Sequence, residues 1–371
     1  MVLKEIFDQD KAVGILQQAY AADKCAHAYI FAGPEGVGKF KTACEWARLL
    51  LCKQPIIKND FADSCGTCQS CRLFEAGSHP DFAHIYKELR EFTEDGKGKA
   101  PPVDLPIDVI REFLVAKVSN RPTLSQRKVF IVSEAERLNT SSQNCLLKVL
   151  EEPPEYCCIV LLCTRMEKLL PTTKSRCQTI RFGPIDNSRI IEKLQDMGLE
   201  ETPARYFARL AQGSLGAACR WAQLDLGGAN LYQAKKELIN SLAGYELTDA
   251  LNLAQKLLVD SKKVAGLWSE LDKATSKTDI NRKALKTFVQ MFIAAFQDVI
   301  KHHVTPVKEG TNFDQQKQID KLAARFDAER AAEKISDCYR TLNWIESSVN
   351  EKLIFERLLL SLADSDTIKV Q

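Results

Sequence analysis

The sequence predicts an α/β P-loop domain with a parallel sheet, followed by two helical parts. Three observations lead to this prediction. A short apolar run, a glycine-rich turn and an amphipathic segment follow one another within residues 28–52. Strand-like apolar runs then alternate with helical segments to about residue 182, which is typical of a parallel sheet. Beyond that point, apolar residues recur at helical spacing, as expected for packed helices.

The glycine-rich turn matches a phosphate-binding loop in all but its last position. A buried strand is predicted over residues 28–32 and a helix over 39–52. Between them the pattern G-x-x-x-x-G-K-[ST], whose backbone amides and lysine hold phosphates, is met by Gly33, Gly36, Gly38 and Lys39. The last position should carry a hydroxyl for Mg²⁺, but here it is Phe40. Thr42 lies about 200° farther round the helix, so we do not expect it to replace that hydroxyl.

A second element of the nucleotide site is also altered. The apolar run over residues 129–132 predicts a strand, and in P-loop ATPases such a strand ends in Asp-Glu. The aspartate supports Mg²⁺, and the glutamate activates water. Here the pair is Ser133-Glu134. Because Phe40 and Ser133 both stand at metal-holding positions, the sequence predicts that Mg²⁺-dependent hydrolysis is lost and that Glu134 is vestigial. Lys39 is retained, so ATP is expected to bind weakly or not at all.

Four cysteines follow the P-loop helix with the spacing C-x12-C-x2-C-x2-C. They are Cys52, Cys65, Cys68 and Cys71. Four thiolates at this separation predict a closed, structural Zn²⁺ site without an open position for water. Two alternatives remain open: an iron–sulfur cluster, whose usual continuation is missing after Cys71, and a zinc site in which His79 replaces Cys52.

Composition and charge limit the classes of function. The 371 residues are long enough for two or three domains, and 51 basic residues against 49 acidic ones give a net charge of +2. No basic excess indicates nucleic-acid binding by the chain alone. No apolar run reaches the about 18 residues of a membrane span. The N-terminus has no apolar core of a signal peptide, so the thirteen cysteines predict a reducing, cytoplasmic location.

Several segments together resemble one known family. His27 to Phe31 precedes the P-loop, and the cysteine cluster follows its helix. The segments Asn144 to Pro154 (NCLLKVLEEPP), Ser175-Arg176-Cys177 and Asn350 to Leu360 complete the match. With these features the chain resembles the subunits of the bacterial DNA polymerase III clamp loader, an AAA+ assembly. Within that family its altered nucleotide site is similar to delta-prime, the subunit that does not drive the ATPase cycle.

The resemblance implies roles for several residues. The family presents the arginine of Ser175-Arg176-Cys177 to a neighbouring subunit's ATP, as an arginine finger acting in trans. Thr164, which ends the next predicted strand, matches a position that senses the γ-phosphate. The helical part that follows often carries Gly-Ser-x-Arg, a nucleotide sensor, but here Gly216 stands in place of the arginine. The resemblance therefore implies a subunit that completes a neighbour's active site and lacks its own.

The family also implies the domain order and the partners. We expect an AAA+ core with a zinc module over residues 1–182, a small helical lid over 183–243 and an all-α oligomerisation collar over 244–371. The partners are expected to be gamma/tau and delta subunits in a hetero-oligomer of the DNA polymerase III holoenzyme, a DNA-directed DNA polymerase. The sliding clamp and primer-template DNA are reached through this assembly.

Two other functions are weighed against this one. An active gamma/tau-type ATPase is disfavoured by Phe40, Ser133 and Gly216 together. A zinc-containing nucleic-acid-binding module or nuclease is disfavoured because the chain has neither a basic footprint nor a nuclease-like carboxylate cluster.

Overall fold

The chain divides into two compact units in the computed structural model, which describes residues 3–58, 61–96, 102–273, 275–304, 310–347 and 350–362. The α/β unit comprises Met1–Asp186 with Gly213–Gly216, and the helical unit comprises Asn187–Gln212 with Ala217–Gln371. The finer division into a lid over 183–243 and a collar over 244–371 stays a prediction.

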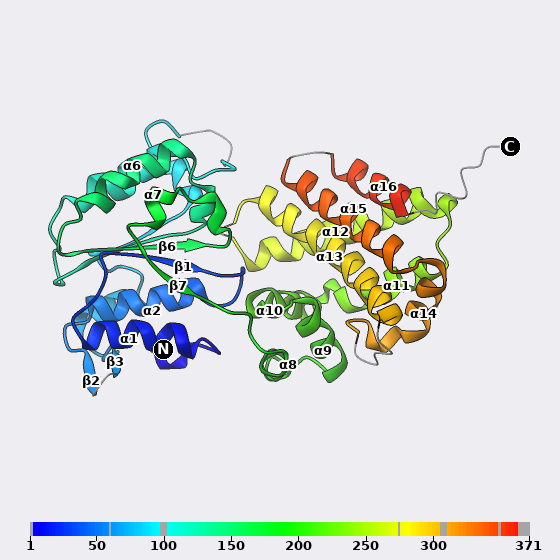
Figure 1. The fold of residues 1–371 in the computed structure, drawn as a ribbon, viewed down its shortest axis with the longest axis horizontal. Helices are drawn as coiled ribbons and strands as arrows, with labels where there is room; N and C mark the ends of the chain where they lie inside the picture. The colour runs from blue at the N-terminus through cyan, green and yellow to red at the C-terminus, as the bar shows by residue number, and fades with distance from the viewer. Residues whose placement is uncertain are drawn as a thin grey trace. The chain divides into compact units, whose positions relative to one another are not determined.

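The α/β unit is built on a five-stranded sheet whose neighbouring strands are all parallel, in the order β4-β5-β6-β1-β7 (Figure 1). The strands are β1 (Ala28–Ala32), β4 (Phe82–Ile85), β5 (Lys128–Val132), β6 (Cys157–Cys163) and β7 (Gln178–Arg181). This arrangement confirms the predicted P-loop fold class. The carboxyl ends of β1, β5 and β6 therefore meet at one edge of the sheet, which is where parallel sheets place their sites.

Helices cover both faces of this sheet (Figure 1). Helices α1 (Asp10–Ala21) and α2 (Lys39–Leu51) lie on one face, and their Leu16 and Trp46 pack with Tyr29 and Phe31. On the other face, α6 (Thr140–Glu151) packs its Leu146 among the alternate strand residues. Strand side chains point to opposite faces in turn, so the central strands β5, β6 and β1 are buried on both sides and consist of nearly continuous apolar runs. The edge strand β7 is largely exposed.

The boundaries of α6 follow from its sequence. The side chain of Asn139 accepts a hydrogen bond from the backbone N–H of Ser142 at 2.8 Å and so caps the helix start. The helix ends at Glu151, two residues before Pro153, because proline disfavours helical geometry in the residue that precedes it. Short helical segments complete this unit: α4 (Ile107–Ile110), a π-helical turn (Arg111–Val115), α5 (Ala116–Val118) and α7 (Pro171–Lys174).

The helical unit is built from long helices, and the polar contacts of Asp298 and Asp314 are among those that support their packing. Helix α13 packs against α12, α14 and α15. The helices are α8 (Asn187–Asp196), α9 (Glu201–Leu210), α10 (Leu215–Leu224), α11 (Leu231–Ala243), α12 (Ala250–Leu271), α13 (Lys277–Val304), α14 (Gln316–Arg325), α15 (Ala328–Glu346) and α16 (Glu351–Leu362). Among the described residues, none of the helices is both long enough and apolar enough to span a membrane.

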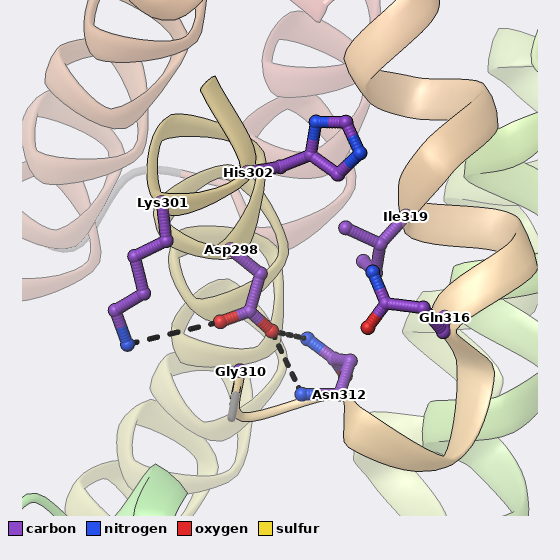
Figure 2. Close-up of a pocket in the computed structure, with 7 residues that line it drawn as sticks. All are labelled: Asp298, Lys301, His302, Gly310, Asn312, Gln316 and Ile319. Atoms are coloured by element: carbon purple, nitrogen blue, oxygen red, sulfur yellow. Dashed lines mark hydrogen bonds and ion pairs between the residues drawn. The ribbon is translucent and has the colours of Figure 1, made fainter. Parts of the chain in front are cut away.

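The first of these polar contacts is centred on Asp298 (Figure 2). Its carboxylate accepts hydrogen bonds from the backbone N–H groups of Thr311 and Asn312, at 2.8 and 2.7 Å, and from the Asn312 side chain at 2.9 Å. Lys301 lies 3.9 Å away. In the second contact, the fully buried Lys235 pairs with Asp314 at 2.5 Å. Both contacts fix residues 311–314, which lie just before α14, because a buried charge is tolerated only when it is paired.

Candidate functional site

The P-loop lies where the sequence places it, between β1 and α2. Gly36 and Gly38 adopt φ values of 75° and 100°, in the left-handed region that favours glycine. The N–H of Gly33 donates to the carbonyl of Cys163 at the end of β6, so the loop begins at the edge of the sheet. The Thr42 hydroxyl donates to the Gly38 carbonyl at 3.0 Å, within its own helix. Thr42 is therefore not directed to the position that Phe40 occupies.

Lys39, the phosphate-binding residue of the motif, is bonded to its own loop. Its ammonium group donates to the carbonyl oxygens of Gly33 and Pro34 at 2.6 and 2.5 Å. Burial lowers the pKa of Lys39, and the nearby carboxylates of Glu136 and Glu35 oppose this effect. A phosphate would have to compete with two carbonyl oxygens for this ammonium group.

The two altered metal positions are joined through His84. The Phe40 ring lies 4.7 Å, centroid to centroid, from the His84 imidazole, and Nε2 of His84 hydrogen-bonds the Ser133 hydroxyl at 2.8 Å. Burial lowers the pKa of His84 to about 4, so the imidazole is neutral at physiological pH. Phe40 offers no ligand atom, and the Ser133 oxygen is engaged with His84. This contact set replaces a hydroxyl and a carboxylate by an aromatic, uncharged cluster.

Gly216 shows why the sensor position is glycine here. Its N–H donates to the carbonyl of Gly36 in the P-loop at 2.9 Å. A Cβ atom on Gly216 would lie 3.0 Å from the Cα of Gly36, closer than side-chain carbons normally approach backbone. A larger residue here would need the P-loop backbone to give by a few tenths of an ångström. Glycine suits this close contact and has no side chain to sense a phosphate.

Glu134 and Thr164, two further residues predicted for the nucleotide site, are both engaged by neighbouring side chains. Glu134 has a φ of 51°, and its carboxylate pairs with Arg137 at 2.9 Å and with Lys87 at 3.9 Å. The Thr164 hydroxyl donates to Glu136, whose other oxygen accepts from the Thr164 backbone N–H at 3.2 Å. The structure therefore gathers the P-loop, Ser133, Glu134 and Thr164 at one edge of the sheet. The polar side chains there are already bonded to other groups of the protein.

The neutral state of His84 predicts a pH dependence of stability. In the unfolded chain the imidazole takes up a proton near pH 6.5, whereas burial lowers its pKa to about 4 in the folded chain. The unfolded state therefore binds more protons between these two values. The contribution is fully present above pH 6.5 and is lost as the pH falls toward 4, by at most about 3 kcal/mol.

Urea unfolding at pH 7.5, 6.0 and 5.0 checks this expectation. His84→Gln, which keeps a hydrogen-bonding group but does not titrate, should lose less stability at pH 5.0 than the unmodified chain. His302→Gln, at a histidine with a side chain 42% exposed, serves as the matched control. Parallel stability curves for His84→Gln and the unmodified chain would contradict the expectation.

The four predicted metal ligands converge in a module formed after α2. Cys52 follows the helix, a hairpin of β2 (Ile56–Lys58) and β3 (Phe61–Asp63) intervenes, and Cys68 caps α3 (Gln69–Glu75), which contains Cys71. All four sulfur atoms lie within 4.8 Å of one another. The Cys52 sulfur is 3.6 Å from that of Cys65 and 3.9 Å from that of Cys68. Tetrahedral coordination with 2.3 Å bonds requires about 3.8 Å between sulfurs, so the donor set fits a metal ion.

His79 is not available as an alternative ligand. Its Nε2 hydrogen-bonds the Ser70 hydroxyl at 2.8 Å, and its Nδ1 accepts from the backbone N–H of Asp81 at 3.1 Å. Ser70 in turn donates to the carbonyl of Leu51 at 2.6 Å. Both ring nitrogens are thus occupied, Nε2 through Ser70 to the end of α2 and Nδ1 with the backbone that follows His79, so His79 supports the module from outside the cysteine cluster.

Arg176 lies apart from the P-loop contacts, just after α7. Its Nη2 pairs with the carboxylate of Glu151 at 2.8 Å, and its Nη1 donates to the Thr172 carbonyl at 3.0 Å and contacts the Ser175 hydroxyl at 3.5 Å. The Arg176 side chain is 34% exposed. A guanidinium group held in this way at the surface is accessible to a phosphate presented from outside.

Three residues at these sites were not found from the sequence: His84, Glu136 and Glu151. His84 lies within β4, and nothing local indicates which strand pairs with it. Glu136 stands two residues beyond Glu134 and belongs to no expected motif position. Glu151 is part of the segment that resembles the family, but its contact with Arg176 spans 25 residues of chain. All three depend on tertiary contacts, which local pattern does not encode.

Comparison with known proteins identifies the family of the chain. Residues 8–186 match the family described as "DNA polymerase III, delta subunit", and residues 273–364 match "DNA polymerase III, delta subunit, C terminal". A DNA polymerase III subunit delta' of Pseudomonas aeruginosa is 38% identical over 152 residues, which are 41% of this chain and 42% of that protein. The match thus spans less than half of that relative.

A longer match is found in Escherichia coli. Its DNA polymerase III subunit delta' is 32% identical over 248 residues, which cover 65% of this chain and 68% of that protein. Among solved structures, a DNA polymerase III gamma subunit-related protein of Thermotoga maritima is similar at a TM-score of 0.43 and 18% identity, over 95% of this chain and 97% of that one. The family matches and the Escherichia coli relative show that the chain belongs to the delta-prime family of DNA polymerase III clamp-loader subunits.

Proposed function

We propose that this chain is a non-hydrolysing subunit that supports ATP-driven loading of the sliding clamp onto primed DNA. The observation that carries the proposal is the contact of Phe40 with His84 and of His84 with Ser133. Mg²⁺ requires oxygen ligands in near-octahedral geometry. An aromatic ring at one of its two protein positions and a hydrogen-bonded serine at the other do not supply them.

The second half of the proposal is that Arg176 acts on a neighbouring subunit's ATP. Its guanidinium group is partly exposed and is oriented by neighbouring groups. By contrast, Lys39 of the chain's own P-loop donates its hydrogen bonds to carbonyl groups of that loop. A planar, permanently charged fork suits phosphate oxygens. In this role the subunit stabilises charge that develops on the γ-phosphate during the neighbour's reaction, without hydrolysing ATP itself.

The proposed partners follow from the family. Gamma/tau subunits would supply the ATP that Arg176 contacts, and delta would complete the hetero-oligomer. The sliding clamp and primer-template DNA would be engaged by the assembly. The cysteine module would hold a structural Zn²⁺, since four sulfur donors leave no open coordination position for catalysis.

The isolated chain is expected not to hydrolyse ATP. Phe40→Thr alone and Phe40→Thr with Ser133→Asp should also remain inactive, because Gly216 supplies no sensor side chain and His84 still occupies the site. The measurement is phosphate release with excess Mg²⁺, and a gamma/tau subunit of the same organism is the positive control. Turnover that disappears on Lys39→Ala would contradict the proposal and favour the alternative of an active gamma/tau-type ATPase.

A further inference from the structure

The contacts of Arg176 leave part of its guanidinium group available. An arginine has five N–H donors. Glu151 takes one at Nη2, and Thr172 and Ser175 take at most two at Nη1. Within the part of the chain that the structure describes, at least two donors, including the one on Nε, remain for an incoming anion. The group is therefore fixed along one side and free along another.

The carboxylate that pairs with Arg176 belongs to a helix. Glu151 is the last residue of α6, and α6 is tied to the segment before α7 by Gln143. The Gln143 side chain donates to the carbonyl of Lys168 at 3.2 Å and accepts from the N–H of Leu170 at 2.8 Å. These bonds fix the first turn of α6 to the segment before α7, and the same helix carries Glu151 at its other end. Glu151 consequently reaches Arg176 from a fixed point rather than from a flexible loop.

We propose that Glu151 is a positioning residue for Arg176. By holding Nη2, it restricts the rotamers of a long side chain before a neighbour's phosphate arrives, so less conformational entropy is lost when the site assembles. The Glu151 side chain is itself 51% exposed, so water screens its charge and it does not trap the guanidinium group. This inference rests on the proposed function, in which Arg176 acts on a neighbouring subunit.

The test uses the clamp loader reconstituted with the partner subunits of the same organism. The variants are Glu151→Ala, Glu151→Gln, Arg176→Ala and the double variant Glu151→Ala/Arg176→Ala. Glu155→Ala, an exposed carboxylate on the same connection, is the matched control. Steady-state ATP hydrolysis gives kcat and KM, and the rate that is lost in Arg176→Ala defines the part that depends on Arg176.

Glu151→Ala should lower the Arg176-dependent part of kcat about two- to fivefold, the factor that corresponds to a partly exposed ion pair, with KM for ATP unchanged. Glu151→Gln, whose amide oxygen still accepts the hydrogen bond, should recover most of that loss. The double variant should match Arg176→Ala, because a positioning residue has no effect once its partner is gone. Glu155→Ala should behave like the unmodified chain.

Two results separate the two proposals. If Arg176→Ala lowers hydrolysis but Glu151→Ala does not, the positioning role is overturned and the proposed function stands. If Arg176→Ala itself leaves hydrolysis unchanged in a fully assembled complex, the proposed function fails first. Faster hydrolysis by both Glu151 variants would show that the carboxylate competes with phosphate, which also overturns the positioning role.

Discussion

Replacing Arg176 by alanine is expected to lower ATP hydrolysis and clamp loading by the assembled complex while the chain stays folded. Charge develops on the γ-phosphate of the neighbouring ATP, and a preorganised guanidinium group stabilises the transition state more than the ground state. Arginine fingers in other nucleotide hydrolases contribute about 10³- to 10⁵-fold to the rate at their site. Since only one of several sites is affected, bulk hydrolysis should fall in part, whereas clamp loading, in which the sites act together, should fall further.

Folding should be little affected by this change. The pair with Glu151 is partly exposed on both sides, and such pairs contribute about 0.2–1 kcal/mol to stability. Arg176→Lys should rescue activity poorly, because an ammonium group lacks the planar fork. Arg121→Ala, at an exposed arginine in another loop, is the control for loss of positive charge. Unchanged hydrolysis and loading by a complex shown to be fully assembled would refute the finger role and leave the subunit as a scaffold.

The sequence predicted the strand and helix boundaries around the P-loop well, because their signals are local. The strand and helix on either side of the P-loop end within one residue of their expected limits, at Ala32 and Leu51. Helix α6 likewise begins directly after its capping residue Asn139 and ends at Glu151, two residues before Pro153. Glycines, prolines and capping side chains specify such boundaries through their own backbone preferences, so no tertiary information is needed.

The contacts that define the site's chemistry were not predictable in the same way. Phe40 and Ser133 were identified as departures from a pattern, but their link through His84 depends on β4 pairing with β5. The self-bonding of Lys39 depends on the loop's detailed path, and the docking of Gly216 on Gly36 joins residues 180 positions apart. The sequence pattern shows which metal-holding groups are missing. Only the folded chain shows which contacts have replaced them.

Removing two of the four clustered thiols should abolish metal binding and destabilise the module around them. We expect about one Zn²⁺ per chain, and none after Cys65→Ser with Cys68→Ser, by elemental analysis. The module has two three-residue strands and a seven-residue helix, and Ile56, Ile57 and Phe61 are exposed. With so little apolar core of its own, it relies on coordination, as small metal-binding domains do. Limited proteolysis should therefore cut the variant within residues 52–79.

The sheet beneath the module should survive this change, which gives the experiment its internal control. Both of its apolar layers are built mainly from β1, β5 and β6 with α1, α2 and α6, and the cysteine module adds Ala62 and the partly buried Phe74 to one of them. Cys25→Ser, at a thiol outside the cluster, should keep both the metal and the protease resistance. Iron in the purified protein, or full zinc content in the double variant, would contradict the assignment of a zinc site to these four cysteines. Retained metal with lost protease resistance would instead show that coordination and folding of the module are separate.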